Sequence, residues 1–407
     1  MDNKKNGIPK LRFPGFTGAW EQRKLGEVAE INPSSEIPDN FEYVDLESVV
    51  GTEMIAYRRE NKKTAPSRAQ RLAKKGDIFY QTVRPYQKNN YHFNLTRKDF
   101  VFSTGYAQLR PNINGDFLFV YIQLSNFVNE VLNRSTGTSY PAISPSNLIR
   151  MKVAIPTNNE QEKIGAFFKQ LDSLIALHQR KLEHLQEQKK GLLQKMFPKN
   201  GENVPEVRFP GFTDAWEQRK LGEILSDLYN GQTPSRNVKS YWKGDIPWLT
   251  SGELNHGIVE ETIEKISESG KKAANLRLIP SGTIVIAITG LEAPGTRGNC
   301  AILGIDTTVN QSVMALVVKN NIDTQFIFQW YKKIGEEYGI RYTQGTKQQS
   351  YNYDLVKILP ITIPTTTEEQ QKIGSFFNQL DSLIALHQRK LEHLELMKKG
   401  LLQQMFV

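Results

Sequence analysis

Apolar residues recur in alternating steps of four and three from residue 160 to residue 197. No proline interrupts this stretch, and only His178 and Lys189 place polar side chains in the seam. Such a spacing, held over about five heptads, is typical of coiled-coil helices rather than of ordinary surface helices. It predicts one helix from Glu160 to Phe197, about 57 Å long at 1.5 Å per residue. The apolar seam comprises Ile164, Phe168, Leu171, Ile175, Leu182, Leu185, Leu192 and Met196.

The chain contains this helix pattern twice. Residues 369–406 repeat residues 160–197 almost letter for letter and keep the register of the seam. A shorter segment is also duplicated, because residues 9–28 return as residues 205–224. Two matching seams in one chain most simply pack on each other. If a two-fold axis crosses the pair, the helices run antiparallel and form a rod that acts as a spacer.

The segments between the repeats, residues 29–159 and 225–368, share a layout but not a sequence. Each has a strand that begins with glycine, a polar turn, more strands, a helix, a Gly-Thr loop and a strand ending in Ile-Pro. The leading strands are expected within Gly76–Arg84 and Gly282–Thr289. The pattern predicts an α+β protein in which two mixed-sheet domains with helices are separated by a long antiparallel coiled coil with internal pseudo-two-fold symmetry. The expected divisions are residues 1–159, 160–204, 205–368 and 369–407.

Composition narrows the function classes. The 407 residues carry a formal net charge of +9, which favours a polyanionic partner. The single cysteine, Cys300, excludes an internal disulfide framework and a cysteine-based zinc site. No apolar run approaches the ~20 residues needed to cross a bilayer, and the N-terminus lacks the apolar core of a signal peptide. We therefore expect a cytoplasmic protein with no membrane partner.

The loops of both inserts are rich in side chains that bind phosphate oxygens or read base edges. Taken singly, each of these residues fits an ordinary solvated loop. Because they recur at equivalent places in both inserts, beside basic stretches, we expect a DNA-binding surface on each insert. The candidates in the first insert are Lys62, Lys63, Arg68, Arg71, Arg84, Gln87, Lys88, Asn89, Asn90, Arg134, Thr136, Thr138 and Tyr140. Those in the second are Arg236, Lys239, Tyr241, Trp242, Lys243, Arg297, Asn299, Arg341, Gln344, Lys347, Gln348 and Gln349.

Signatures of catalysis are missing from the sequence. Neither a phosphate-cradling G-x-x-x-x-G-K-[ST] nor a G-x-G-x-x-G after a strand occurs, and there is no H-E-x-x-H or cysteine-rich metal spacing. We expect no catalytic residue, no metal site and no cofactor in this chain.

The arrangement resembles the specificity subunit of type I restriction–modification enzymes over essentially the whole chain. The motifs that carry the resemblance are Trp20 with Lys24–Glu27, Trp216 with Lys220–Glu223, and the Glu-Gln-x-Lys-Ile-Gly start of each long helix. Residues 241–248 (YWKGDIPW) also look like a common opening of target-recognition domains in that family. The first insert lacks this opening, so its domain would belong to another subtype.

The resemblance implies a non-catalytic subunit that reads double-stranded DNA. Each insert would be a target-recognition domain for one half of a split, asymmetric site, and the paired helices would fix the gap. Two methyltransferase subunits would supply S-adenosylmethionine-dependent adenine methylation. Two restriction subunits would supply ATP- and magnesium-dependent translocation and cleavage.

Two alternatives stay open at this point. The chain could be the specificity half of a fused restriction–methylation enzyme, although no methylase motif is present. It could also be a coiled-coil scaffold with protein-binding inserts, which salt-dependent binding to duplex DNA would exclude.

Overall fold

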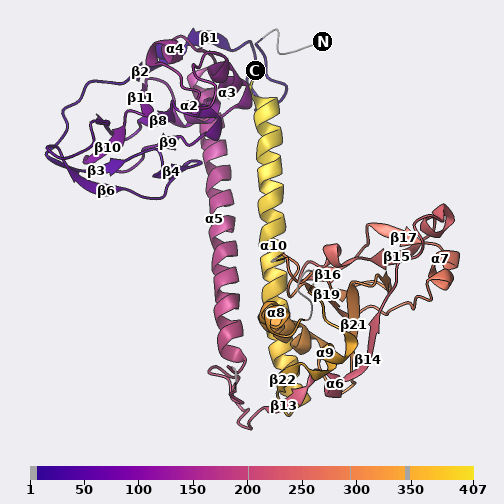
Figure 1. The fold of residues 1–407 in the computed structure, drawn as a ribbon. Coiled ribbons are helices and arrows are strands. Elements are labelled where there is room, and N and C mark those ends of the chain that lie inside the picture. The colour runs from indigo at the N-terminus through magenta and orange to yellow at the C-terminus, as the bar shows by residue number, and fades with distance from the viewer. Residues whose placement is uncertain (1–6, 200, 294, 344–348) are drawn as a thin grey trace. The chain divides into compact units, whose positions relative to one another are not determined.

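The computed structural model describes residues 7–199, 201–293, 295–343 and 349–407 (Figure 1). The chain forms two compact units: Met1–Gln179 with Lys390–Val407, and Arg180–Arg389. Each unit combines one insert with parts of both long helices, and each contains sheets and helices, so the α+β class is confirmed. The units differ from the division expected from the sequence, because the long helices do not stand apart from the inserts. Their apolar seams instead complete the core of each unit.

Two four-stranded sheets form most of the first unit. One has the order β6-β3-β10-β7, with β10 parallel to β3 and its other pairs antiparallel; the other has the order β2-β11-β8-β9 and is antiparallel throughout. Phe79 and Phe102 stack between the two sheets with their ring centroids 3.6 Å apart. The strands are β2 (Ala29–Ile31), β3 (Asn40–Val44), β6 (Arg58–Asn61), β7 (Ala69–Leu72), β8 (Ile78–Gln81), β9 (Tyr91–His92), β10 (Phe100–Ser103) and β11 (Tyr106–Pro111).

Short helices and hairpins complete the first unit. A two-stranded sheet joins the repeated N-terminal segment to the strand before the long helix, and a small hairpin lies at residues 49–54. These elements are β1 (Glu21–Lys24), α1 (Leu25–Val28), β4 (Val49–Val50), β5 (Glu53–Met54), η2 (Pro85–Gln87), α2 (Gly115–Tyr121), α3 (Ser125–Asn133), α4 (Pro145–Ile149) and β12 (Lys152–Ile155).

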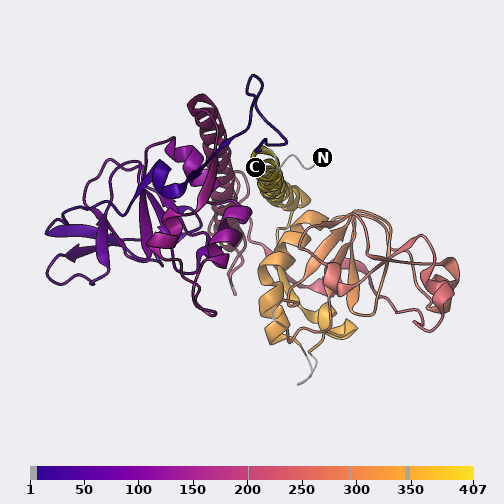
Figure 2. The same cartoon turned by 90° about the horizontal axis from the view of Figure 1, so that it is seen from above.

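The second unit contains a five-stranded sheet of order β14-β21-β18-β19-β16 and a three-stranded sheet of order β17-β15-β20. Helix α8 lies at one end of this unit, and α7 with the three-stranded sheet lies at the other (Figures 1 and 2). The strands are β13 (Glu217–Lys220), β14 (Leu225–Asn230), β15 (Ile246–Leu249), β16 (Ile258–Val259), β17 (Glu264–Ile266), β18 (Ile284–Ala287), β19 (Cys300–Leu303), β20 (Thr308–Val309), β21 (Val313–Val318) and β22 (Pro360–Ile363). The helices are α6 (Leu221–Ile224), η3 (Lys239–Trp242), η4 (Ser251–Glu253), α7 (Glu268–Ala273), α8 (Thr324–Arg341) and α9 (Tyr353–Ile358).

Both units share one skeleton despite their unlike sequences. The strand order β2-β11-β8-β9 corresponds to β14-β21-β18-β19, and the pair β1·β12 corresponds to β13·β22. Helices α2 and α8, which follow the equivalent strands β11 and β21, are capped in the same way, because the side chains of Asn114 and Asp323 accept hydrogen bonds from the backbone N–H groups of Phe117 and Phe326. The backbone N–H groups of the two caps donate to Gln161 and Gln370, which are equivalent residues of the repeated helices. The repeated residues therefore dictate how each insert is seated.

The two repeated helices are α5 (Asn158–Met196) and α10 (Thr367–Met405). In the first unit, the rings of Phe168 and Phe406 lie 5.9 Å apart, and Lys398 Nζ lies 2.5 Å from Asp172 Oδ1. Residue numbers thus rise along one helix as they fall along the other. The second unit has the same relationship, because Phe197 packs on Phe377 and Lys189 pairs with Asp381. Within each unit, the portions of α5 and α10 are antiparallel.

The short repeat fastens the ends of these helices. In the first unit, Arg12 makes two hydrogen bonds, of 2.6 and 2.7 Å, to the buried carboxylate of Glu160, and Leu11 N–H donates to Gln404 O. In the second unit, Arg208 binds Glu369 with the same two distances. Trp20 of the same repeat packs edge-on against Phe406, with the ring centroids 5.7 Å apart. Packing is thus one role of the short repeat.

Candidate nucleic-acid interface

Two polar loops of the first unit meet beyond the end of β8. The early loop is residues 83–90 and the late loop is residues 134–142; Val83 and Ala142 form an antiparallel bridge between them. Arg84 N–H donates to Pro141 O at 2.7 Å, and the Arg84 guanidinium lies 4.3 Å from the centroid of the Tyr140 ring. Tyr140 is 63% exposed. The structure therefore brings together two clusters that lie about fifty residues apart in the sequence.

Unusual backbone conformations hold these loops in place. Arg84 and Lys88 have φ values of 54° and 56°, which place them in the left-handed region on either side of the short helix η2. In the late loop, Thr136 and Ala142 pair as a narrow hairpin. Gly137 turns this hairpin with a φ of 91°, and a Cβ atom there would lie 2.9 Å from Tyr140 O. The hairpin leaves Thr136, Thr138 and Tyr140 exposed.

Several predicted contact residues support the early loop instead of offering a side chain to a ligand. Asn90 is only 1% exposed; it accepts from Gln81 N–H at 2.8 Å and donates to Gln123 Oε1 at 3.1 Å. Lys88 Nζ donates to Gln123 O at 2.8 Å, and burial together with Lys398 lowers the pKa of Lys88. Asn89 accepts from Gly51 N–H at 2.8 Å. Gln87 stays exposed, although Gln81 donates to its side-chain oxygen.

The basic residues of the first insert divide into exposed and half-buried positions. Lys62 and Lys63 lie in the turn after β6 and Arg68 lies just before β7, and all three are exposed. Arg71 on β7 is half-buried, and its Nε has no hydrogen-bond partner among the described residues. Burial lowers the pKa of Arg71. A half-buried cation without a carboxylate is a candidate to receive a phosphate oxygen.

Other arginines of the first insert, including the predicted residue Arg134, already form ion pairs with carboxylates. The Arg134 guanidinium binds Glu130 at 2.7 Å, one helical turn earlier. Arg58 pairs with both Asp45 and Glu60, at 2.6 and 2.8 Å.

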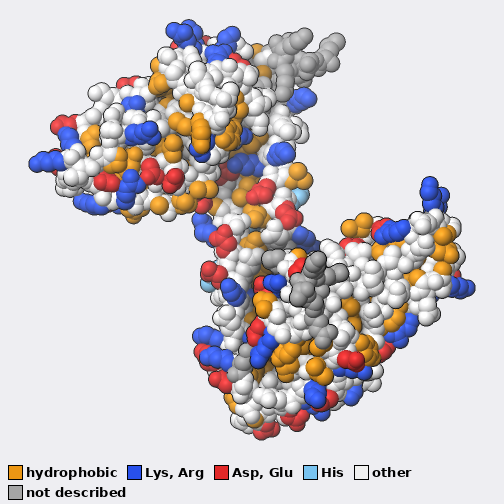
Figure 3. Space-filling model, in the orientation of Figure 1, with side chains coloured by type: hydrophobic (Ala, Val, Ile, Leu, Met, Phe, Trp, Pro, Cys, Tyr) orange, Lys and Arg blue, Asp and Glu red, His pale blue; other side chains and the backbone are white. Residues whose placement is uncertain are grey.

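On the face shown in Figure 3, basic side chains gather at the tip of the first unit around β6 and around α7 of the second unit.

The second unit joins its loops in the equivalent way. The Gly-rich loop, residues 290–299, follows β18 in the way that the early loop follows β8. The late loop of the second unit is residues 341–351. Thr289 and Ser350 form an antiparallel bridge, and Leu291 N–H donates to Gln349 O at 3.1 Å. Gln349 N–H in turn donates to Glu292 Oε2 at 2.9 Å. Gln344, Lys347 and Gln348 lie outside the described residues.

Three other predicted residues lie in or beside the Gly-rich loop and α8. Arg297 donates to Glu292 O at 3.2 Å, and its aliphatic chain passes over Gly339. Asn299 donates to Gly295 O at 2.9 Å and so closes the Gly-rich loop on itself. Arg341 ends α8 as an exposed residue 4.0 Å from Glu337.

The opening of the second insert builds a small core. Arg236 is bound by both carboxylate oxygens of Glu264, at 2.5 and 2.8 Å, and its guanidinium lies 3.6 Å from the centroid of the Trp242 ring. Trp242 packs edge-on against Trp248, and Tyr241 is half-buried beside α7. These three predicted residues are therefore engaged within the unit. Lys239 and Lys243 remain exposed.

Sequence reasoning missed the β4–β5 hairpin. Gly51 has a φ of 61° at its turn and donates to Asn89, which fixes the hairpin beside the early loop. Val50 and Tyr86, on the two sides of this contact, are about half exposed. A Gly-Thr pair between short apolar runs is a hairpin signal that could have located it.

Within the described residues there is no cluster of three or more His, Cys, Asp and Glu residues arranged to hold a metal ion. Over the same residues, none of the helices combines the length and apolar character that a membrane span requires.

Comparison with known proteins identifies relatives over most of the chain. The family model of the type I restriction modification DNA specificity domain matches residues 18–187 and 213–396. The MjaIX specificity subunit of a type I restriction enzyme from Methanocaldococcus jannaschii is 29% identical over 196 residues, which are 47% of this chain and 44% of that protein. The EcoR124I/EcoR124II specificity subunit from Escherichia coli is 27% identical over 41% of each chain. The match thus spans less than half the length of these two relatives.

Longer but weaker likenesses also occur. The HindI specificity subunit from Haemophilus influenzae is 19% identical over 88% of this chain and 94% of that protein. The crystal structure of a type I restriction–modification S subunit from M. genitalium covers 98% of this chain and 99% of its own, with a TM-score of 0.66 and 15% identity. At that identity the structural likeness shows the fold.

Proposed function

Because the chain belongs to the type I restriction–modification DNA specificity family, we propose that it is the non-catalytic subunit that reads a bipartite, asymmetric DNA site. Each insert acts as a target-recognition domain and reads one half of the site. Base contacts in the loops specify sequence, and contacts to phosphates position the domain.

One observation carries this proposal. In both units, two polar loops distant in sequence are bridged beyond the end of the equivalent central strand, β8 or β18. The skeleton around the loops is the same, whereas the loop sequences differ in length and in most residues apart from a shared Gly-Thr pair in the late loops. A shared scaffold with unlike loops suits two readers that perform one task on two sequences.

The repeated helices serve as the spacer in this proposal. The antiparallel portions of α5 and α10 within each unit, and the matched 39-residue lengths of both helices, support a continuous antiparallel coiled coil with pseudo-two-fold symmetry. The length of such a pair sets the gap between the half-sites, and one added helical turn would lengthen it by about 5.4 Å.

The same helices offer a repeated docking surface. Leu174 and Leu177 of α5 are each 41% exposed, and their repeats Leu383 and Leu386 of α10 are 44% and 40% exposed. An apolar pair displayed twice, in identical local sequence, suits a partner bound in two copies. We assign it to two methyltransferase subunits, with two restriction subunits completing the complex. S-adenosylmethionine, ATP and magnesium then act in those partners, and the complex works on DNA in the cytoplasm.

Mapping of methylated adenines in cells that carry this chain and its methyltransferase tests the proposal. The expected result is one bipartite motif with a fixed gap. Replacing residues 29–159 with another insert should change one half of the motif only. Inserting a helical turn into both α5 and α10 should change the gap and leave both halves intact.

The alternatives give different results in this experiment. A scaffold with protein-binding inserts would leave methylation without a motif that follows the inserts, and its DNA affinity would lack a steep dependence on salt. A fused enzyme would methylate without a separate methyltransferase subunit.

A further inference from the structure

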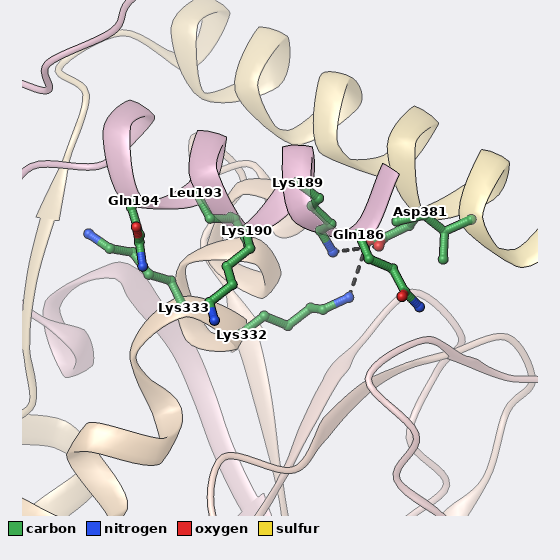
Figure 4. A pocket seen from close by; sticks show the side chains of 9 residues that line it. Gln186, Lys189, Lys190, Leu193, Gln194, Lys332, Lys333 and Asp381 are labelled. Carbon is green, nitrogen blue, oxygen red and sulfur yellow. Dashed lines mark hydrogen bonds and ion pairs between the residues drawn. The ribbon is translucent and has the colours of Figure 1, made fainter. Parts of the chain in front are cut away.

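A basic cavity lies in the second unit where α5, α8 and α10 meet (Figure 4). Its volume is about 450 Å³. Four of its nine lining residues are lysines, and one is a carboxylate. The lysines are Lys189, Lys190, Lys332 and Lys333, and the carboxylate is Asp381.

Two of the lysines share the one carboxylate. Lys189 pairs with one oxygen of Asp381, and Lys332 Nζ lies 3.2 Å from the other. The Lys189 and Lys332 side chains are only 9% and 13% exposed. One carboxylate neutralises one ammonium group, so this arrangement keeps an excess positive charge in a poorly solvated place.

Neighbouring groups respond to this excess charge. Burial and the adjacent Lys332 lower the pKa of Lys189. Burial would raise the pKa of Asp381, but the two lysines bring it below its ordinary value. Burial and, next, Lys332 lower the pKa of His256, whose backbone oxygen accepts from Lys332 at 2.8 Å. Burial alone would lower the pKa of Lys189 and His256; beside it, Lys332 contributes to all three shifts in the direction expected of a nearby positive charge.

The other lysines extend the charge through the cavity. In Figure 4, Lys190 enters from α5 beside Lys332, and the Lys333 side chain runs toward Gln194 at the opposite end. Lys333 Nζ donates to Pro198 O at 3.0 Å, near the end of α5. Burial lowers the pKa of Lys333, and the carboxylate of Glu337 opposes that shift.

The first unit provides an internal comparison, because its equivalent position is more nearly balanced. The repeat places Lys398, Lys399 and Asp172 where the second unit has Lys189, Lys190 and Asp381, but Glu395 replaces Gln186. Counted from the helix caps Asn114 and Asp323, Gln123 and Leu124 stand where the second unit has Lys332 and Lys333. With Lys88, which approaches Lys398, the first unit has three lysines and two carboxylates. The second unit has four lysines and two carboxylates when Glu337, which acts on Lys333, is counted with Asp381. The repeated frame therefore does not require the lysine excess.

We propose that this cavity binds a phosphate-bearing anion through Lys190, Lys332 and the partly neutralised Lys189. Phosphate oxygens accept several charge-assisted hydrogen bonds at once and would supply the missing negative charge. The phosphate comes either from a small polyphosphate or from the backbone of bound DNA. Binding of a small polyphosphate is independent of the reading of a DNA site.

Calorimetric titration of the full chain with inorganic pyrophosphate tests this proposal. Lys332→Met should weaken binding about tenfold, because a charge-assisted hydrogen bond is lost. Lys190→Gln changes an exposed residue and should weaken binding several-fold without affecting folding, which keeps the test valid if Lys332→Met unfolds. The matched control is Lys399→Gln, which removes the equivalent lysine of the other repeat and should leave binding unchanged.

Salt-dependent binding to a duplex of random sequence forms the second arm. One outcome is that pyrophosphate does not bind, but Lys190→Gln reduces the salt dependence of DNA binding and Lys399→Gln does not. In that case the phosphate bound in the cavity belongs to the DNA backbone. The proposal is overturned if neither ligand distinguishes the two variants. A failure to find a methylation motif would not affect this proposal, because pyrophosphate binding requires no DNA recognition site.

Discussion

The guanidinium of Arg84 lies 4.3 Å above the ring of Tyr140, and this contact joins the early and late loops of the first unit. Arg84 is held in a left-handed conformation, and Tyr140 lies within the hairpin that Thr136 and Ala142 close and Gly137 turns. The pair therefore presents an exposed aromatic face with a cation stacked on it, in a position fixed by the backbone. Stacked arginine and tyrosine side chains are suited to base contacts.

Substituting Tyr140→Ala should relax the recognition of one half of the DNA site and weaken site binding by about 1–3 kcal/mol. The other half-site and the gap should stay unchanged, because they depend on the second insert and the helices. Methylated-adenine mapping measures the first effect and titration of a duplex containing the site measures the second. Tyr353→Ala is the control, since Tyr353 lies under Lys357 at 4.2 Å but outside the loops. Equal effects of both substitutions would contradict the assignment.

Arg71 should contribute one phosphate contact. Its Nε lacks a partner among the described residues, and burial lowers its pKa, so a bound phosphate would satisfy it. Arg71→Met should reduce the slope of log K against log salt by about one and leave sequence preference intact. Arg58→Met should leave the slope unchanged, because Asp45 and Glu60 already neutralise Arg58. Equal slopes for wild type and Arg71→Met would exclude the contact.

The repeated frame could be predicted from sequence because its signals are local. The four-three spacing appears twice, and the observed helices begin two residues before the predicted start and end one residue before the predicted end. The predicted leading strands also form, as β8 and β18. Periodicity encodes such elements directly.

Whether an individual loop side chain is free to bind DNA could not be predicted, because this depends on neighbours that are distant in the sequence. Arg236 looks like an exposed phosphate contact until Glu264 closes on it from 28 residues away. Asn90 looks like a base reader, but Gln81 and Gln123 enclose it. A polar loop composition thus locates a surface, whereas tertiary contacts decide which side chains remain available on it.

The bidentate pairs Arg12–Glu160 and Arg208–Glu369 should be strong determinants of stability. The glutamate side chains are 0% and 1% exposed, so removal of either arginine leaves a buried carboxylate without its partner. Arg12→Ala and Arg208→Ala should each lower the free energy of unfolding by about 3 kcal/mol in urea titrations. Adding Glu160→Gln to Arg12→Ala should recover part of the loss. Arg23→Ala removes an exposed pair with Glu21 and should leave the free energy of unfolding essentially unchanged.

Lys189 should make the free energy of unfolding depend on pH in the alkaline range. Its pKa in the folded protein is lowered to about 8 from 10.5, mainly by burial and by Lys332. Between these values the unfolded chain binds more protons than the folded chain, so the free energy of unfolding gains a term that rises with pH. Below pH 8 both states hold the proton and the penalty of burying it is fully present. Lys189→Met removes this term.

Urea titrations of wild type and Lys189→Met across pH 8 to 10.5 measure the effect. The stability of wild type relative to the variant should increase by about 1–3 kcal/mol over that range. Other partly buried lysines, such as Lys333, are present in both proteins and therefore cancel in the difference. Adding pyrophosphate should reduce the increase, because an anion in the cavity stabilises the protonated amine. A difference between the two proteins that stays constant over this range would show that Lys189 is not held in a desolvated, positively charged cluster.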